Sequence, residues 1–180
     1  MRLRSDAGVA PGADAPLLHL DAATRALIRA EGEGAYPREC CGFLLGRVEA
    51  GSKQVATALP SRNEDGAGDG RRYLISPRAH LDARLAAADR NLEILGFYHS
   101  HPDRPARPSE YDRMHALPSS TYLILAVTDG RAGELRSWVL AEDTARFREE
   151  FLARPSVSKR SRGGGIRHVD PRRIQHRSRS

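Results

Sequence analysis

Residues 99–112 read His-Ser-His-Pro-Asp-Arg-Pro-Ala-Arg-Pro-Ser-Glu-Tyr-Asp, and they follow a short apolar run, Ile-Leu-Gly-Phe-Tyr, at 94–98. An apolar run of this length with β-branched and aromatic residues predicts a buried strand. His99 and His101 then stand at the end of that strand. A strand repeats every two residues, so both side chains point to the same side, about 6–7 Å apart at the backbone. The two imidazoles can therefore bind one metal ion.

Asp112 follows His101 by eleven residues, after a loop that contains three prolines. Its carboxylate would add a hard oxygen ligand to the two imidazoles. Two histidines and one carboxylate leave a fourth position open, which is typical of catalytic rather than structural zinc sites. Ser109-x-x-Asp112 also resembles a helix capping box. A helix that begins at Ser109 would fix the direction of Asp112, so the capping and metal interpretations are compatible.

With these residues the chain resembles the JAMM (MPN-plus) metalloproteases, whose pattern is His-Ser/Thr-His, seven residues, Ser, two residues and Asp. The resemblance extends over about 17–152 and includes an upstream glutamate. Glu39 matches that glutamate, in the segment Arg-Glu-Cys-Cys-Gly-Phe-Leu-Leu-Gly at 38–46. The small bacterial members that act on ubiquitin-like sulfur-carrier proteins are the most similar. The resemblance implies one Zn²⁺ per chain on His99, His101 and Asp112, with catalytic roles for Glu39 and Ser109.

The chemistry of such a site assigns these roles. Zinc held by two neutral imidazoles and a carboxylate lowers the pKa of bound water to about 7, so hydroxide is available as the nucleophile at neutral pH. Breaking an amide also requires a proton acceptor and then a proton donor, and we predict that Glu39 serves as both general base and general acid. Otherwise Glu39 is an ordinary strand-end carboxylate. The Ser109 hydroxyl is the expected oxyanion donor, provided that its backbone rather than its side chain caps the helix.

The resemblance also implies a substrate, the amide bond that follows the C-terminal Gly-Gly of a ubiquitin-like or sulfur-carrier protein. An extended tail can add to a sheet edge through main-chain hydrogen bonds, and glycines pass a slot too narrow for side chains. Two alternatives stay open. One is a broader isopeptidase that removes a ubiquitin-like modifier from lysine. The other is a non-catalytic scaffold module of the MPN type.

The side chains around the motif have simpler expected roles. Ser100 should point away from the two histidines, because it alternates with them along the strand, and its role is expected to be structural. Arg104 and Arg107 on the motif loop are expected to be exposed to solvent. Asp103 and Glu110 are acidic neighbours that the pattern does not include.

Length and composition predict one domain. The chain has 180 residues, which suffices for one domain with a proper core. It has no run of about 18 apolar residues, which predicts no transmembrane helix and no membrane partner. The N-terminus lacks the apolar core of a signal peptide, and the only cysteines, Cys40 and Cys41, are adjacent in sequence. We therefore expect a cytoplasmic protein without disulfides.

The charge divides the chain into parts. Residues 154–180 hold nine Lys/Arg and one Asp, so this segment carries +8 while the formal net charge of the whole chain is +6. We predict a disordered leader at 1–15, a JAMM metalloprotease domain at 16–153 and a basic disordered tail at 154–180. The tail could contact nucleic acid, but a solubilising role is the preferred interpretation, and nucleic acid is not an expected partner.

Hydrophobic periodicity predicts strands at 17–20, 43–45, 54–59, 73–75, 94–98, 122–128 and 135–140. Helices are expected from Asp21 to about 31, where glycines would end it, from Ser76 to about 92, and over 142–152. The second helix should bury Leu81, Leu85, Ala88 and Leu92. These elements predict an α/β class, with a mixed, largely antiparallel sheet flanked by helices. The resemblance implies a cytidine-deaminase-like α-β-α sandwich.

Overall fold

The computed structural model describes residues 17–65, 72–141 and 146–153. The predicted leader and basic tail lie outside these residues. Within them, no helix is both long enough and apolar enough to cross a membrane.

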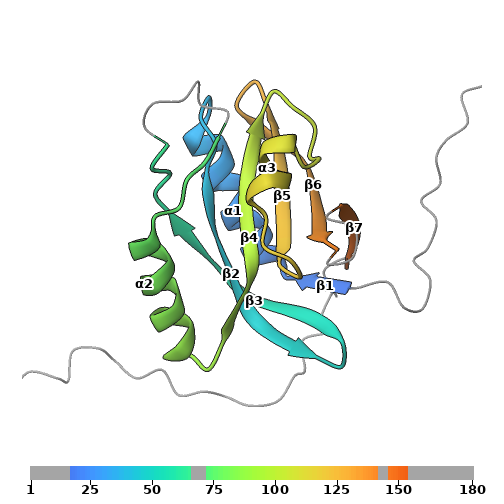
Figure 1. Ribbon diagram of the computed structural model, residues 1–180. Helices are drawn as coiled ribbons and strands as arrows, with labels where there is room; N and C mark the ends of the chain where they lie inside the picture. Colours follow the sequence, from blue (N-terminus) through green and yellow to red (C-terminus); the bar gives the residue numbers. More distant parts are fainter. Residues whose placement is uncertain (1–16, 66–71, 142–145, 154–180) are drawn as a thin grey trace, which may run out of the picture.

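The described residues form one sheet with three helices (Figure 1). The strands are β1 (Leu17–Leu20), β2 (Cys41–Glu49), β3 (Ser52–Ser61), β4 (Glu93–Pro102), β5 (Thr121–Thr128), β6 (Arg131–Leu140) and β7 (Phe147–Leu152). The helices are α1 (Ala22–Ala35), α2 (Pro77–Ala88) and α3 (Glu110–His115). The sheet closes on itself in the order β1-β3-β2-β4-β5-β6-β7. Four neighbouring pairs are antiparallel and three are parallel, which confirms the predicted class of a mixed, largely antiparallel α/β domain.

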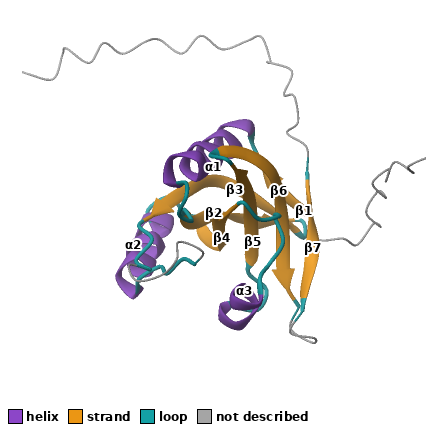
Figure 2. Ribbon diagram, turned by 90° about the horizontal axis from the view of Figure 1, so that it is seen from above, coloured by secondary structure: helices purple, strands orange, loops and turns teal. Residues whose placement is uncertain are grey.

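Different helices pack against the two faces of the sheet (Figure 2). An inner cluster joins Ile28 of α1 to buried residues of five strands, among them Leu44 and Leu125. An outer cluster joins Ala83 and Ala87 of α2 to the other face of the sheet. Its strand members are Phe43, Leu45, Phe97 and Tyr122. Neighbours along β2 belong alternately to the two clusters, as expected for a strand that is buried on both faces.

The central strand β4 carries the motif. It pairs with β2 on one side and with β5 on the other, so Cys41 lies opposite His99 and His99 lies opposite Ile124. Its whole second half is buried. His99 and His101 share the face of Phe97 because they are two and four residues beyond it. That face is the one covered by α2.

The predicted end of the first helix is wrong, because α1 continues through Gly32 and Gly34 to Ala35. Gly32 is buried, and a Cβ built on it would lie 2.6 Å from Cδ2 of Leu125. The glycine is needed for a close approach of helix and sheet, and it does not end the helix. Asp21 caps α1 as predicted, accepting a hydrogen bond from the N–H of Thr24 at 2.7 Å.

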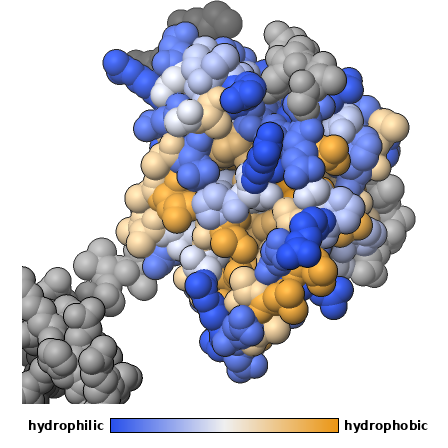
Figure 3. Space-filling model, turned by 90° about the vertical axis from the view of Figure 1, so that its left-hand side faces the viewer, coloured by the Kyte–Doolittle hydropathy of each residue, from blue (hydrophilic) through white to orange (hydrophobic). Residues whose placement is uncertain are grey.

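The buried stripe predicted for the second helix is wrong at Leu81, Leu85 and Ala88, whereas Leu92, which follows α2, is partly buried against the outer cluster. Leu81 and Leu85 are 50% and 57% exposed, whereas Ala83 and Ala87 face the sheet. Small side chains at these two positions let the helix lie close to the sheet, and the leucines then point outward. The surface on this side of the molecule shows apolar patches among charged side chains (Figure 3). His80 is half-buried, and its ring meets the Phe43 ring edge-on with centroids 5.3 Å apart.

Residues 73–75 were predicted as a strand, but the structure assigns them to no strand. They are held by a local contact instead. Asn63 Oδ1 accepts a hydrogen bond from the N–H of Leu74 at 3.0 Å, and the carbonyl of Leu74 accepts one from Glu64 at 2.9 Å. This segment therefore runs beside residues 63–64 without joining the sheet.

The helix predicted over 142–152 is wrong from 147 onward, where the strand β7 pairs with β6 and β1. Residues 142–145 of that prediction lie outside the described residues. The four-residue spacing of Phe147 and Phe151 favoured a helix, but pairing with two strands overrides local preference. The buried carboxylate of Glu150 fastens β7 to its neighbours. It accepts hydrogen bonds from the hydroxyls of Ser137 at 2.8 Å and Thr121 at 2.9 Å, and it lies 3.1 Å from the Lys53 ammonium.

We expect Glu150→Ala to lower the free energy of unfolding by on the order of 3 kcal/mol, because two buried hydroxyls and a partly buried ammonium lose their acceptor. The melting temperature should fall by roughly 10 °C for a domain of this size. Glu149→Ala is the matched control, since Glu149 pairs with Arg136 at the surface and such pairs contribute about 0–1 kcal/mol. Equal melting temperatures for the two variants would contradict the proposed role of Glu150.

Candidate metal centre

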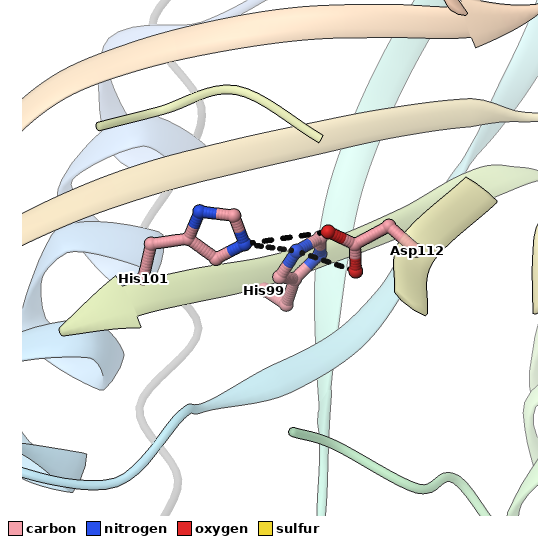
Figure 4. Close-up of side chains that lie close together, drawn as sticks. All are labelled: His99, His101 and Asp112. Carbon is pink, nitrogen blue, oxygen red and sulfur yellow. Dashed lines mark hydrogen bonds and ion pairs between the residues drawn. The ribbon is translucent and has the colours of Figure 1, made fainter. Parts of the chain in front are cut away.

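The structure brings His99, His101 and Asp112 together (Figure 4). Nε2 of His99 lies 3.1 Å from Nε2 of His101 and 3.3 Å from Oδ1 of Asp112. Nε2 of His101 lies 3.5 Å from Oδ2 of Asp112. All three side chains are buried. Two strand residues and one helix residue thus bring two imidazole nitrogens and a carboxylate together, and their role as metal ligands stays a prediction.

The hydrogen bonds around the histidines favour metal binding. Nδ1 of His101 lies 2.9 Å from the carbonyl oxygen of Pro105, which can only accept, so Nδ1 donates and Nε2 keeps its lone pair toward Asp112. Burial lowers the pKa of His99, which favours the neutral imidazole that a metal requires. The His99 ring stacks on Tyr73 with centroids 4.7 Å apart. Two imidazole nitrogens and one carboxylate therefore fit zinc in donor type and number.

Asp112 is fixed by a reciprocal cap at the start of α3. The Ser109 hydroxyl oxygen accepts a hydrogen bond from the N–H of Asp112 at 3.1 Å, and Asp112 Oδ2 accepts from the N–H of Ser109 at 2.6 Å. The Ser109 hydroxyl also donates to Oδ2 at 2.6 Å. Burial alone would raise the pKa of Asp112, but its contacts with His99, His101 and Ser109 hold that pKa well below its usual range. The carboxylate is therefore charged and oriented.

The same cap bears on the predicted role of Ser109 as oxyanion donor, which stays a prediction. The side chain of Ser109 caps the helix. From the sequence, its hydroxyl was expected to act as oxyanion donor only if the backbone of Ser109, and not its side chain, formed the cap. The single hydroxyl proton is directed at Asp112. To reach an oxyanion, this proton must turn away from the carboxylate.

Glu39 lies two residues before the start of β2 and is buried. Burial raises its pKa to about 8, although the nearby Arg104 guanidinium acts in the opposite direction. Its backbone carbonyl accepts a hydrogen bond from the side-chain amide of Asn63 at 3.1 Å. Because Cys41 pairs with His99, the start of β2 lies beside the histidine end of β4.

Ser100 supports this arrangement from the opposite face. Its hydroxyl accepts a hydrogen bond from the N–H of Cys40 at 2.9 Å, and its own N–H donates to the Cys40 carbonyl at 3.1 Å. These bonds extend the pairing of β2 and β4 to the residue next to Glu39. Both cysteines are buried thiols; burial raises the pKa of Cys40 to about 11 and that of Cys41 to about 12.

Three contributors were not foreseen from the sequence, namely Tyr73, Asn63 and the pairing of Arg104 with Glu39. Arg104 was expected to be exposed, but its side chain is 30% exposed and contacts the Glu39 carboxylate. The contacts of Tyr73 and Asn63 join loops that are distant in sequence from the motif, and no local spacing signals them.

A cavity of about 220 Å³ opens beside the centre. Asp112 and Tyr73 form part of its wall, and most of the remaining lining is aromatic or aliphatic. The other lining residues are Leu74, Ile75, His80, Phe97, Tyr111, His115, Leu117 and Tyr122. An extended peptide with an apolar side chain can therefore lie next to the candidate metal ligands.

Comparison with known families agrees with this geometry. The model of a family described as prokaryotic homologs of the JAB domain matches residues 21–141, which include Glu39 and the whole motif. The chain belongs to this Prok-JAB family. The resemblance to JAMM proteins drawn from the sequence is thereby confirmed.

Several relatives of this JAB domain are known by name. Desampylase of Haloferax volcanii is 36% identical over 100 residues, 54% of this chain and 68% of that protein. Tail tip assembly protein K of Escherichia phage N15 is 33% identical over 110 residues, 61% of this chain but 40% of that protein. A probable TtuB-protein conjugate cleaving protease of Thermus thermophilus is 40% identical over 70 residues, 39% of this chain and 44% of that protein. The chain therefore spans less than half of two of these relatives.

Solved structures of two further proteins share the JAB fold. A protein from Salinibacter ruber superposes with a TM-score of 0.61 at 38% identity, covering 78% of this chain and 92% of that one. Protein DSY2949 from Desulfitobacterium hafniense gives a TM-score of 0.67 at 28% identity, covering 76% and 91%.

Proposed function

We propose that this JAB domain is a zinc metallopeptidase that hydrolyses the amide bond after the C-terminal Gly-Gly of a ubiquitin-like or sulfur-carrier protein. The observation that carries the proposal is the buried group of His99, His101 and Asp112, with the carboxylate of Glu39 at the adjacent strand end. The names of two relatives, desampylase and TtuB-protein conjugate cleaving protease, support a protein conjugate as the substrate. The catalytic domain is proposed to comprise residues 16–153 and to act in the cytoplasm.

In this proposal His99, His101 and Asp112 hold the ion. When bound, zinc supplies a Lewis acid and lowers the pKa of water. Glu39 takes a proton from the attacking water and later gives it to the leaving nitrogen. A pKa of about 8 suits both steps, since a general base works best when its pKa lies near the working pH.

Ser109 has two roles in the proposal, at different stages. Before substrate binds, its hydroxyl orients Asp112. During the reaction the same hydroxyl turns to donate to the oxyanion of the tetrahedral intermediate, while Asp112 retains the hydrogen bond from the Ser109 N–H. The ligand therefore stays oriented when the hydroxyl leaves it.

The cavity beside Asp112 supports an extended substrate tail. The two glycines pass the centre, and we expect an apolar side chain that precedes them to enter the cavity against Tyr73 and Phe97. A cavity with several aromatic side chains on its wall favours an aliphatic or aromatic group over a charged one.

The test is cleavage of defined conjugates by zinc-loaded protein, followed by mass spectrometry. One substrate is a carrier protein with a single amino acid attached after Gly-Gly, and the other is the same carrier linked to the lysine of a peptide. We expect release of the carrier with a free Gly-Gly terminus, and loss of the reaction in EDTA. Faster cleavage of the lysine conjugate would identify the broader isopeptidase. No cleavage of either conjugate by zinc-loaded protein would favour the scaffold alternative.

A further inference from the structure

The loop between His101 and Ser109 places the charged guanidinium of Arg104 against the carboxylate of Glu39, the proposed general base. The guanidinium of Arg104 contacts Oε1 of Glu39, and the two side chains are 30% and 2% exposed. This contact joins the loop after β4 to the segment that leads into β2. It is a charge-assisted hydrogen bond in a mostly buried setting, where such contacts are strong and directional.

The backbone on both sides of Arg104 is anchored. Before it, the N–H of Asp103 donates to Val127 at 2.7 Å, and the Asp103 carboxylate accepts from Tyr36 and from the N–H of Asp129. After it, the carbonyl of Pro105 accepts from His101 at 2.9 Å. The loop therefore holds Arg104 from both ends.

Ala106, which follows Pro105, strengthens this anchor. Ala106 is fully buried against Ile124, Ala126 and Trp138, and its carbonyl accepts a hydrogen bond from Nε1 of Trp138 at 3.0 Å. A loop fixed in this way does not swing freely. The contact of Arg104 with Glu39 is thus a built feature, unlike the contact of a side chain on a mobile loop.

The charges around Glu39 indicate what its contact with Arg104 does. Asp112 and Asp65 both oppose ionisation of the buried Glu39 carboxyl, and burial opposes it most, whereas Arg104 favours it. A general base must be ionised before it can accept a proton. It must also be held in one orientation, because misplacement by about 1 Å can reduce the rate 10²-fold.

We infer that Arg104 is a positioning residue for Glu39: its guanidinium aligns the buried carboxyl group for proton transfer and favours its ionised form. This inference rests on the proposed function. Arg104 acts through Glu39 and has no contact with the reacting atoms in this scheme. Arg104 lies on the loop between His101 and Ser109.

The first test compares three variants on the first conjugate described above, a carrier protein with a single amino acid attached after its Gly-Gly. Arg104→Met should reduce kcat about 10- to 100-fold, a part of the 10²–10⁴ attributed to general acid–base help. Zinc content and KM should change little. Arg104→Lys should recover part of the loss, because it restores the charge without the planar fork. Arg107→Met is the matched control, since Arg107 is exposed on the same loop, and its kcat should stay within about twofold of the parent.

The second test is a double-mutant cycle with Glu39→Gln, measured at high enzyme concentration under single-turnover conditions. If Arg104 acts through Glu39, Arg104→Met should have no further effect in the Glu39→Gln background. Glu39→Asp, whose shorter side chain retracts from the guanidinium, serves as the background if the residual rate of Glu39→Gln is too low to measure.

Two outcomes would overturn the inference. An increased kcat in Arg104→Met would show that the guanidinium blocks the base, and additive losses in the cycle would show a role independent of Glu39. In both cases the proposed function would stand, provided that Glu39→Gln is inactive. If Glu39→Gln retains normal turnover, the proposed mechanism fails first and the inference fails with it.

Discussion

Glu39→Gln is expected to reduce kcat by about 10²–10⁴ while the protein keeps its zinc and its affinity for the carrier. The amide has the shape of the carboxylate but cannot accept a proton, so the variant separates chemistry from binding. The measurement is turnover of the Gly-Gly conjugate, with zinc per chain determined by metal analysis of the same preparation. A scaffold module would have no turnover to lose, so the experiment also decides between enzyme and scaffold.

Normal turnover with normal zinc in this variant would falsify the role of Glu39. The acidic neighbours in the motif would then be the next candidates, but both are engaged elsewhere. Asp103 accepts hydrogen bonds from Tyr36 and Asp129, and the Glu110 carboxylate pairs with Arg113 on the surface of α3. Of the three carboxylates, Glu39 is therefore the best placed to act as the general base.

His101→Ala is expected to remove most of the bound metal and all measurable activity. Two ligands remain, and the loss should exceed the 10- to 100-fold reduction in metal affinity that is typical when a residue supporting a ligand is removed. The readouts are zinc per chain and the rise in melting temperature on adding zinc. A ligand present at about 100 times its Kd stabilises the folded state by about 2.7 kcal/mol, and this stabilisation should disappear in the variant.

His19→Ala is the control for the metal experiment, because His19 lies on β1 outside the centre. It should bind zinc and respond to zinc as the parent does. Full zinc occupancy in His101→Ala would show that the ion is held by other residues. A large loss in His19→Ala would show that the parent binds zinc at a second place.

The candidate site could be predicted from the sequence where its parts are close together. The two-residue period of a strand places His99 and His101 on one side, and the capping box fixes Asp112 three residues after Ser109. Glu39 is different, because its approach depends on the pairing of Cys41 with His99, which are 58 positions apart. No local pattern gives that register, and Glu39 was recognised through the family resemblance alone.

The fold was predictable where one periodicity clearly dominated. The apolar runs at 43–45, 94–98 and 122–128 all lie in strands. Two of the errors show the physical cause clearly. Leu81 and Leu85 of α2 point outward because alanines allow a closer approach to the sheet, and β7 forms because two neighbouring strands supply its hydrogen bonds. In both cases a tertiary contact outweighs the spacing of the apolar residues.

The closure of the sheet by β1 and β7 has a consequence for how the domain can be joined to other proteins. The N–H of Ala153 donates to the carbonyl of Leu18 at 2.9 Å, so the chain directly after β7 is hydrogen-bonded to β1. Figure 1 shows this pair at the side of the sheet away from α2. Partners fused directly at position 17 or at position 153 would therefore leave the domain from the same region. Joining position 153 to position 17 would make a circularly permuted domain, with new termini in the turn at Ala50–Gly51.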